Sequence, residues 1–260
     1  MQPSAVNQEA EALLHWKLAV RAMASGAAEW SEPSLGGMTA IWAGSMFPLT
    51  NQFFVEDREN IAEMVPRAVD FAASRQVPWM LSCCRDWLTD EALAAMRKHG
   101  MAPAMQLTYM TAGRLRAPVH PEPHADYRLV NSLELAGVAC DLNCAAYGMP
   151  VEWGRSGLAS PRMWTEEGVG IIAYVDNVPV STASVVPTNG CLNVVCVATA
   201  QEYRGRGHAE ATMRRALDLA ARELRLPKTV LHASDMGLPI YERMGYQPAT
   251  ALTVFAPEHG

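Results

Sequence analysis

The feature that most limits the fold of this chain is an internal repeat in its sequence. Residues 100–110 (GMAPAMQLTYM) match residues 245–255 (GYQPATALTVF) at a constant offset of 145, with glycine, proline, alanine, leucine and threonine in the same places. Residues 67–73 likewise match residues 215–221 at an offset of 148. Chance similarity between alanine-rich helices would explain the second match but not the first. Two matches in the same order predict a tandem repeat of one folding unit.

A proline-rich segment separates the two copies. Pro118, Pro121 and Pro123 exclude a regular helix or a central strand there. We therefore expect a first unit over residues 1–117, a linker over residues 118–126 and a second unit over residues 127–260. The alternative is a long surface loop within one domain, but the repeat on either side argues for a joint. A length of 260 residues also suits two domains of medium size.

Composition and charge exclude several classes of protein. Half of the residues are hydrophobic and 18% are charged, which is typical of a folded globular protein. The net charge is −6 without a block of Lys and Arg, so we do not expect nucleic acid as a partner. The sequence has neither a leader pattern nor an apolar run of 18 residues, which predicts a cytoplasmic protein without a membrane partner. A monomer and a homodimer both stay open.

The six cysteines do not form a recognisable metal site. None of them lies in a C-x-x-C pattern, and no histidines accompany them at zinc-ligand spacing. We therefore expect reduced structural thiols and no bound metal.

The second half has a readable order of elements. Hydrophobic periodicity and turn residues predict strands over residues 127–130, 170–175, 179–186, 192–198, 229–233 and 250–255, and helices over residues 132–147, 151–158, 207–224 and 238–244. Asp176 and Asn177 form a hairpin turn between the second and third strands. The resulting order is β-α-α-β-β-β-α-β-α-β, a mixed α+β unit.

A glycine-rich segment joins the strand over residues 192–198 to the next helix. Its core, residues 204–209 (RGRGHA), has two glycines where the backbone can turn tightly and approach a ligand. The free N–H groups and the dipole at the start of the helix favour an anion such as a pyrophosphate. Because such a loop is often only a tight connection, its position in the order of elements decides its interpretation.

This segment resembles the acetyl-CoA-binding motif Q/R-x-x-G-x-G/A of the GCN5-related N-acetyltransferases (the GNAT family). Arg204, Gly207 and Ala209 stand at the defining positions, and the order of elements is also that of the family. The resemblance covers about residues 127–257. It implies two tandem GNAT-like units, each with a mostly antiparallel sheet flanked by helices. The implied function is an acetyl-CoA-dependent N-acetyltransferase that moves the acyl group from the thioester directly to an amine.

A second segment carries the same resemblance. Residues 234–246 (SDMGLPIYERMGY) are similar to the family pattern N-x-x-A-x-x-L-Y-x-x-x-G-F, and Tyr241 stands where the family has its common general acid. Tyr241 would protonate the departing thiolate, whereas the alternative for this residue is a core aromatic at helical spacing. Ser234 replaces the family's asparagine, and its hydroxyl can still form a hydrogen bond with the cofactor.

The resemblance also implies which residues contact acetyl-CoA. Backbone N–H groups at the strand end would pair with the pantetheine arm and stabilise the tetrahedral oxygen. We expect His208 to cover the cofactor rather than to transfer protons. The implied set is Val197, Ala198, Thr199, Arg204, Gly205, Arg206, Gly207, His208, Ala209, Glu210, Ser234 and Tyr241.

The base and the acceptor site are less readable. The polar candidates for a base are Asn193, Cys196 and His232, but a buried cysteine or histidine is more often structural, so we assign none. The acceptor could be a small amine or a protein amine. Candidates for its contacts are Glu152, Trp153, Arg155 and Trp164, and the alternative is a solvated helix pair with two packing tryptophans.

The first half lacks the features that would bind a cofactor. At the offset of 148 its loop reads Glu56-Asp57-Arg58-Glu59, whose carboxylates would repel phosphate, and at the offset of 145 Met96 replaces Tyr241. Pro66 falls inside the matching helix, which it must start, kink or break. We expect this unit to be structural, with a core supplied by Trp16, Trp30, Trp42, Trp79 and Trp87. The alternative function for the whole chain is a non-catalytic acyl-CoA-binding sensor or scaffold.

Overall fold

The structure is a computed structural model that describes residues 5–119 and 121–258. The outermost residues of both expected units and residue 120 of the expected linker lie outside the described residues. The first half contains α1 (Ala5–Ala24), β1 (Met38–Trp42), β2 (Asn51–Val55), α2 (Ile61–Ala73), β3 (Met80–Cys84), α3 (Asp90–Lys98) and β4 (Met101–Ala112). Pro66 lies inside α2 and does not end this helix.

The second half has the expected order of elements with one addition. It contains β5 (Asp126–Leu129), α4 (Leu133–Tyr147), α5 (Val151–Leu158), α6 (Pro161–Thr165), β6 (Val169–Val175), β7 (Val178–Thr188), β8 (Cys191–Thr199), α7 (His208–Leu224), β9 (Thr229–Ala233), α8 (Leu238–Met244) and β10 (Gln247–Pro257). The added element is α6, a single turn that Pro161 begins. Such a short segment has too little periodicity to be predicted.

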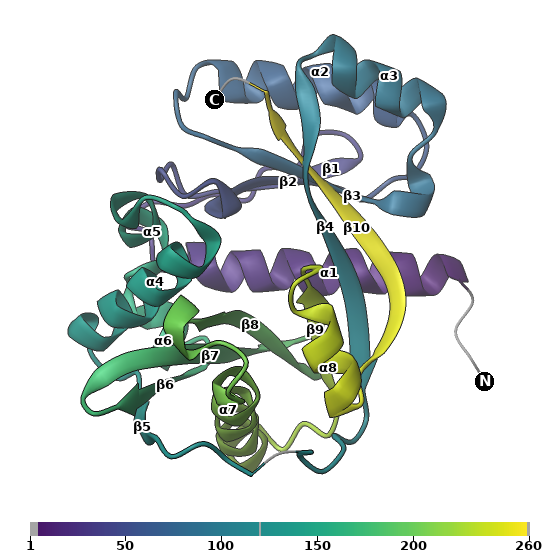
Figure 1. The fold of residues 1–260 in the computed structure, drawn as a ribbon. Helices are drawn as coiled ribbons and strands as arrows, with labels where there is room; N and C mark the ends of the chain where they lie inside the picture. Colours follow the sequence, from purple (N-terminus) through teal and green to yellow (C-terminus); the bar gives the residue numbers. More distant parts are fainter. Residues whose placement is uncertain (1–4, 120, 259–260) are drawn as a thin grey trace.

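All ten strands of the described chain belong to one sheet, in the order β1-β2-β3-β10-β4-β9-β8-β7-β6-β5 (Figure 1). The expectation of a separate sheet in each half is therefore corrected. The two halves join through their last strands, because β10 pairs with β3 of the first half and β4 pairs with β9 of the second. The two strands also pair with each other in antiparallel register, from Gln247 opposite Thr111 to Pro257 opposite Met101.

The same series of pairings occurs on both sides of the β10–β4 pair. In the first half β1 is antiparallel to β2, β2 is parallel to β3, and β3 is antiparallel to β10. In the second half β7 is antiparallel to β8, β8 is parallel to β9, and β9 is antiparallel to β4. Helices α2 and α7 begin at Ile61 and His208, and the preceding residues, Asn60 and Gly207, both have left-handed backbones. The structural counterpart of Gly207 is thus Asn60, one residue beyond the Glu59 expected from the sequence offset.

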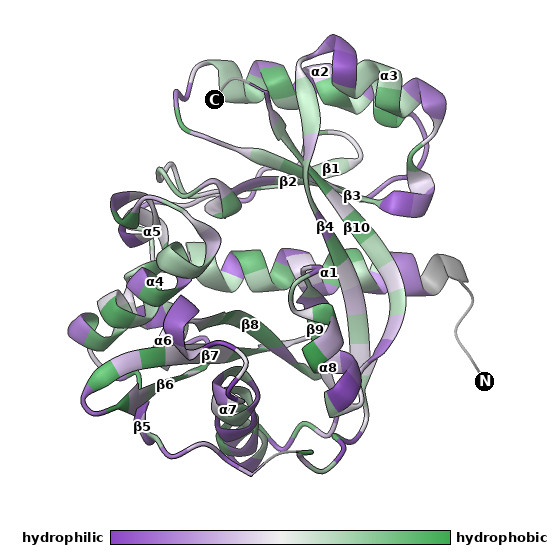
Figure 2. Cartoon of the chain, in the orientation of Figure 1, coloured by the Kyte–Doolittle hydropathy of each residue, from purple (hydrophilic) through white to green (hydrophobic). Residues whose placement is uncertain are grey.

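Helices α1 and α7 cover opposite faces of the sheet. Val195 of β8 belongs to the hydrophobic cluster around α1, whereas Leu192 and Val194 belong to the cluster around α7. Figure 2 shows mainly apolar residues along β8 and polar residues on the outward side of α7. The alternation along β8 therefore gives each face of the strand to a different helix.

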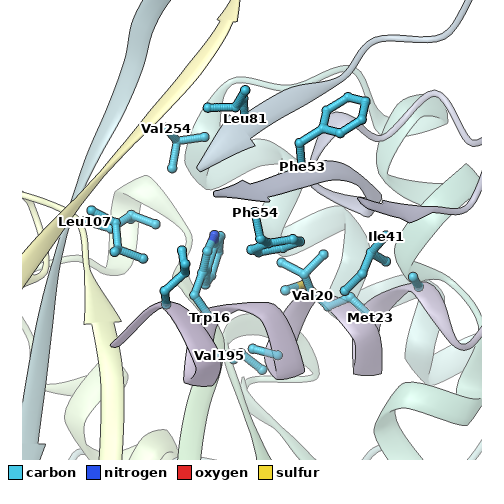
Figure 3. Packing of buried hydrophobic residues seen from close by; sticks show 14 of the residues in the cluster. Trp16, Val20, Met23, Ile41, Phe53, Phe54, Leu81, Leu107, Val195 and Val254 are labelled. Carbon is cyan, nitrogen blue, oxygen red and sulfur yellow. The ribbon is translucent and has the colours of Figure 1, made fainter. Parts of the chain in front are cut away.

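Helix α1 packs against both halves of the chain. Figure 3 shows Trp16 and Val20 of α1 close to Phe54 of β2 and to Val195 of β8, and all four belong to one buried cluster. The tryptophans expected in the core of the first half are buried there, with Trp30 partly buried against the same cluster: Trp16, Trp30, Trp42, Trp79 and Trp87. The core of the first half is thus continuous with that of the second.

Candidate functional site

A cavity opens where β8 and β9 part from each other. The two strands pair with each other only over residues 192–194 and 229–231. Beyond that point β8 pairs with β7 alone and β9 pairs with β4 alone. We call the gap between residues 195–199 and residues 232–234 the fork. A cavity of about 470 Å³ lies at the fork and is lined by parts of β8, α4, α7, α8 and the linker. Strands that part in this way leave backbone N–H and C=O groups free to bind an extended ligand.

A β-bulge shapes the β8 side of the fork. Thr182 of β7 lies opposite Ala198 and Ser184 lies opposite Val195, so Cys196 and Val197 together face a single residue. Cys196 has a φ of 53°, a left-handed conformation that is unusual for a residue other than glycine. The bulge re-aims the backbone of residues 197–199, all of which line the cavity.

The glycine loop (residues 204–207) and the start of α7 form the other end of the cavity. Gly205 and Gly207 have φ values of 74° and 84°, and a Cβ at Gly207 would have only Pro123 within 4 Å. Gly207 precedes the first residue of α7, and no side chain caps this helix. The first N–H groups of α7 thus have no partner in the helix and stand beside an open, glycine-lined space. Such a cradle has the dipole and the donors that favour an anion.

Arg204 does not point freely into this cradle. Its Nε donates to the carbonyl oxygen of Thr199 at 3.1 Å, and a terminal guanidinium nitrogen donates to that of Ala146 at 3.2 Å. The side chain thus fastens the end of α4 to the end of β8. Arg206, also expected at the site, does not line the cavity, and its guanidinium lies 5.4 Å from the centre of the Tyr203 ring. All the other residues expected to contact the cofactor line the cavity.

His208 and Glu210 are held by neighbours at the start of α7. His208 is 5% exposed and packs edge-on against Tyr203, and burial together with Arg206 lowers the pKa of its imidazole. Glu210 forms an ion pair of 2.7 Å with Arg214. These environments favour a packing role for both side chains over proton transfer.

Two tyrosines approach the fork from different helices. Tyr241 of α8 is partly buried and packs over Gly237, where a Cβ would lie 2.7 Å from its ring. Burial, with Tyr147 and Tyr246 nearby, raises the pKa of Tyr241, so its phenol keeps its proton and can donate it. Tyr147, the last residue of α4, places its hydroxyl 3.5 Å from the carbonyl oxygen of Val197. Sequence reasoning missed Tyr147, whose only signal was its place before the helix-ending Gly148.

None of the three polar candidates for a base lines the cavity, and two of them have structural hydrogen-bond partners. Asn193 is fully buried and donates to the carbonyl oxygen of His15 at 3.0 Å. His232 donates from Nε2 to the carbonyl oxygen of Ala12 at 2.9 Å, and burial lowers its pKa to about 3. Burial also raises the pKa of the Cys196 thiol to about 12. These contacts favour the structural interpretation of all three residues, and no side chain is assigned as a base.

The acceptor candidates on α5 and α6 also lie outside the cavity lining. Trp164 is fully buried and donates to the carbonyl oxygen of Leu158 at 3.0 Å, and Arg155 is ion-paired with Asp141 at 2.6 Å. Glu152 is exposed and Trp153 is partly buried. Trp164 is therefore a packing residue rather than an acceptor contact.

The linker instead contributes to the cavity. Pro118, Pro121, Glu122 and Pro123 line it, and Glu122 forms an ion pair of 2.9 Å with Arg215 of α7. The sequence predicted a joint between two units at this place. The prolines that exclude helix and strand also stiffen the segment, so the joint serves as a wall of the cavity.

In the first half, Glu56 and Asp57 of the corresponding loop, residues 56–59, form an ion pair and hydrogen bonds within the protein. The carboxylate of Glu56 is ion-paired with Lys17 and accepts a hydrogen bond of 2.6 Å from Thr39. Asp57 accepts a hydrogen bond from the backbone N–H of Glu59 at 2.9 Å. Met96 is 1% exposed in the core. This acidic, self-paired loop offers no cradle for a phosphate.

The described residues contain neither a metal-binding cluster nor a membrane-spanning helix. Over residues 5–119 and 121–258, no group of three or more His, Cys, Asp or Glu side chains is arranged to hold a metal ion. None of the helices in these residues combines the length and the apolar character needed to cross a bilayer.

Comparison with known families matches the segment that contains the fork. Residues 166–248 match the family model described as "Acetyltransferase (GNAT) domain". Residues 166–248 are thus similar in sequence to a GNAT acetyltransferase domain. The matched segment includes β8, the glycine loop, α7 and α8, which carry most of the cavity. Acetyl transfer is the general class of chemistry that this match supports. A comparison with curated proteins finds no match.

Solved structures extend the likeness in fold to nearly the whole chain. A GCN5-related N-acetyltransferase from Kribbella flavida is similar at a TM-score of 0.67 and 16% identity, over 97% of this chain and 96% of that one. A functionally unknown conserved protein from Staphylococcus epidermidis ATCC 12228 has a TM-score of 0.65 and 12% identity, over 88% and 94% of the two chains. A GCN5-related N-acetyltransferase-like protein from Streptococcus suis 89/1591 has a TM-score of 0.57 and 14% identity, over 95% and 99%. At these identities the likeness is one of fold, and it includes the first half.

Proposed function

We propose that this protein is an acetyl-CoA-dependent N-acetyltransferase that transfers an acyl group from the CoA thioester directly to an amine. The observation that carries the proposal is one cavity with three matching parts. A glycine cradle at the start of α7 suits the pyrophosphate, the strand end over residues 197–199 lines the space that the pantetheine arm would take, and Tyr241 lines the same cavity. The family match over residues 166–248 supports the same chemistry.

The residues of this chain would divide the work as follows. The N–H groups at the start of α7 hold the diphosphate, while the backbone of residues 197–199 pairs with the amide groups of the arm and stabilises the tetrahedral oxygen. The neutral amine nitrogen bonds to the carbonyl carbon, the bond from that carbon to sulfur breaks, and the Tyr241 hydroxyl gives its proton to the departing thiolate. The proton that the nitrogen loses on becoming an amide passes to solvent, and solvent returns a proton to the Tyr241 phenolate. The raised pKa of Tyr241 keeps this proton in place until the sulfur leaves.

We further propose that the chain is a tandem pair of GNAT-like units, residues 1–117 and 127–260, and that only the second binds the cofactor. The repeated strand pairings and the self-paired acidic loop of the first half support this division of roles. The first half then acts as support, since α1 packs against β7 and β8 of the second half. We place the protein in the cytoplasm.

Titration calorimetry with acetyl-CoA, followed by a screen of amines for release of the free thiol, tests the proposal. We expect one site per chain and turnover with at least one amine. Two equivalent sites would show that the first half has been misinterpreted. Binding of acetyl-CoA without turnover of any small amine or peptide would favour the alternative, a non-catalytic acyl-CoA sensor or scaffold, which the lack of an assigned base keeps open. No binding would overturn both functions.

A further inference from the structure

The side chain of Tyr147 crosses the fork. Its hydroxyl lies 3.5 Å from the carbonyl oxygen of Val197 on β8 and is near the side chain of Ser234, directly after β9. The phenol thus spans the two strands at the place where they part. Tyr147 lines the cavity and is 50% exposed, so much of its ring is open to a ligand.

The position of Tyr147 is fixed from the side of the cofactor loop. Gly148, with a φ of 65°, ends α4 directly after Tyr147. The guanidinium of Arg204 holds the carbonyl oxygens of Ala146 and Thr199 together, which ties this end of α4 to the end of β8. The same residue that stands at the first position of the cofactor motif therefore sets the place of the phenol.

The end of α4 that carries Tyr147 packs closely against α5. Cys196 of the bulge lies near both Tyr147 and Cys144, and the sulfur atoms of Cys140 and Cys144 are 4.0 Å apart. A Cβ on Gly154 of α5 would collide with the Cys144 sulfur, so these groups are already tightly packed. The end of α4 that carries Tyr147 is thus tightly packed.

We propose that Tyr147 limits the length of the acyl group, so that the cavity accepts short acyl-CoA thioesters and excludes long ones. The inference rests on the proposed function, in which the cavity binds an acyl-CoA. Tyr147 lines the same cavity as the glycine loop, Ser234 and Tyr241. With the diphosphate at the glycine loop and the thioester beside Tyr241, as the proposed function requires, the acyl group extends past the sulfur. There it meets the ring of Tyr147. An acetyl group fits against the ring, whereas a longer chain collides with it.

The test is calorimetric and needs no acceptor amine. CoA, acetyl-CoA and hexanoyl-CoA are titrated into the wild-type protein and into Tyr147→Ala. We expect the wild type to bind acetyl-CoA more tightly than hexanoyl-CoA. In Tyr147→Ala the affinity for hexanoyl-CoA should rise by about tenfold, because several methylene groups gain an apolar site, while the affinity for CoA itself stays within about twofold.

Matched variants separate the wall from other roles of Tyr147. Tyr147→Phe keeps the ring without its hydroxyl and should keep the wild-type preference. Tyr147→Leu should show a preference between those of the Phe and Ala variants, and it replaces the Ala variant if that one does not fold. Thermal unfolding of each variant shows whether the fold is kept. If Tyr147→Ala and Tyr147→Leu change the affinity for all three ligands equally, or leave the preference unchanged, the inference is wrong. If the wild type binds CoA but none of the expected preferences appears, only this inference fails, whereas no binding of any ligand overturns the proposed function as well.

Discussion

At the residue scale, Tyr241 is in the protonated form that a general acid needs. Its pKa is raised by burial, and its ring packs against Gly237 and edge-on to Tyr246 at 6.0 Å. Tyr241→Phe removes only the hydroxyl, so the affinity for acetyl-CoA should change by less than about twofold. Turnover should fall by about 10²–10⁴-fold, the usual contribution of a positioned acid. Calorimetry and thiol release with an amine found in the screen measure the two effects.

The neighbouring Tyr246 provides the matched control for Tyr241. Its hydroxyl bonds to that of Thr229 at 2.8 Å inside the core. Tyr246→Phe should therefore reduce stability by about 1 kcal/mol and leave turnover unchanged. Full turnover in Tyr241→Phe would mean that another group protonates the thiolate, which would remove Tyr241 from the mechanism without affecting the cofactor site.

His232 makes the stability of the fold depend on pH. Its ring lies between Trp16 and Tyr109 and near His15, and burial holds its pKa at about 3, below the ordinary value of 6.5. Between these two values the unfolded chain binds a proton that the folded ring does not. The contribution of His232 is therefore fully present above pH 6.5 and is lost as the pH falls toward 3, with a slope of about 1.4 kcal/mol per pH unit.

Urea unfolding between pH 4 and 7 measures this slope. His232→Gln keeps a donor toward the carbonyl oxygen of Ala12 but does not titrate, so its stability should fall less steeply with acid. His124, which is exposed in the linker, is the control, and His124→Gln should keep the wild-type slope. An unchanged slope in His232→Gln would show that the ring does not resist protonation in the folded state.

At the element scale, the glycine loop and α7 act as one anion-binding unit. Gly207→Glu would place a side chain and a negative charge beside the free N–H groups of the helix, where backbone must approach the diphosphate. We expect binding of acetyl-CoA to fall below detection by calorimetry. Gly44 is the control, because it also has a positive φ, of 65°, and open space around a Cβ, but lies outside the cavity lining. Gly44→Glu should show a similar loss of stability and retain binding, and retained binding in Gly207→Glu would contradict the assignment.

The elements around the site differ in how far the sequence predicts them. The order of helices and strands follows from periodicity, and the glycine loop follows from residue types that only a tight turn requires. The bulge at Cys196 could not be predicted from the sequence, because a cysteine has no preference for a left-handed backbone. Tyr147 and the linker wall depend on tertiary contacts between segments distant in the sequence, such as Glu122 with Arg215, and no local pattern encodes these.

At the scale of the whole molecule, the two halves share strands as well as a core. Strand β10 lies between β3 and β4, and β4 lies between β10 and β9. The sequence predicts a repeat but not this arrangement, because β4 and β10 carry the same pattern of residues and either could pair with the strands of either half. The pairing is a property of the complete chain, in which the two equivalent strands lie side by side.

This shared sheet predicts that the chain unfolds as one unit. Separating the halves would leave β3 without β10 and β9 without β4, and would expose the cluster that joins α1 to β8. Neither residues 1–117 nor residues 127–260 should then fold alone, because each would have unpaired strand edges and an open core.

Differential scanning calorimetry of the full chain should show a single transition whose calorimetric and van't Hoff enthalpies agree. Cutting the chain at a protease site placed in the linker before Asp126 should preserve that single transition, since the described linker residues before Asp126 take part in no strand pairing. Two transitions, or a folded fragment of either half, would show that the halves are independent domains that merely touch.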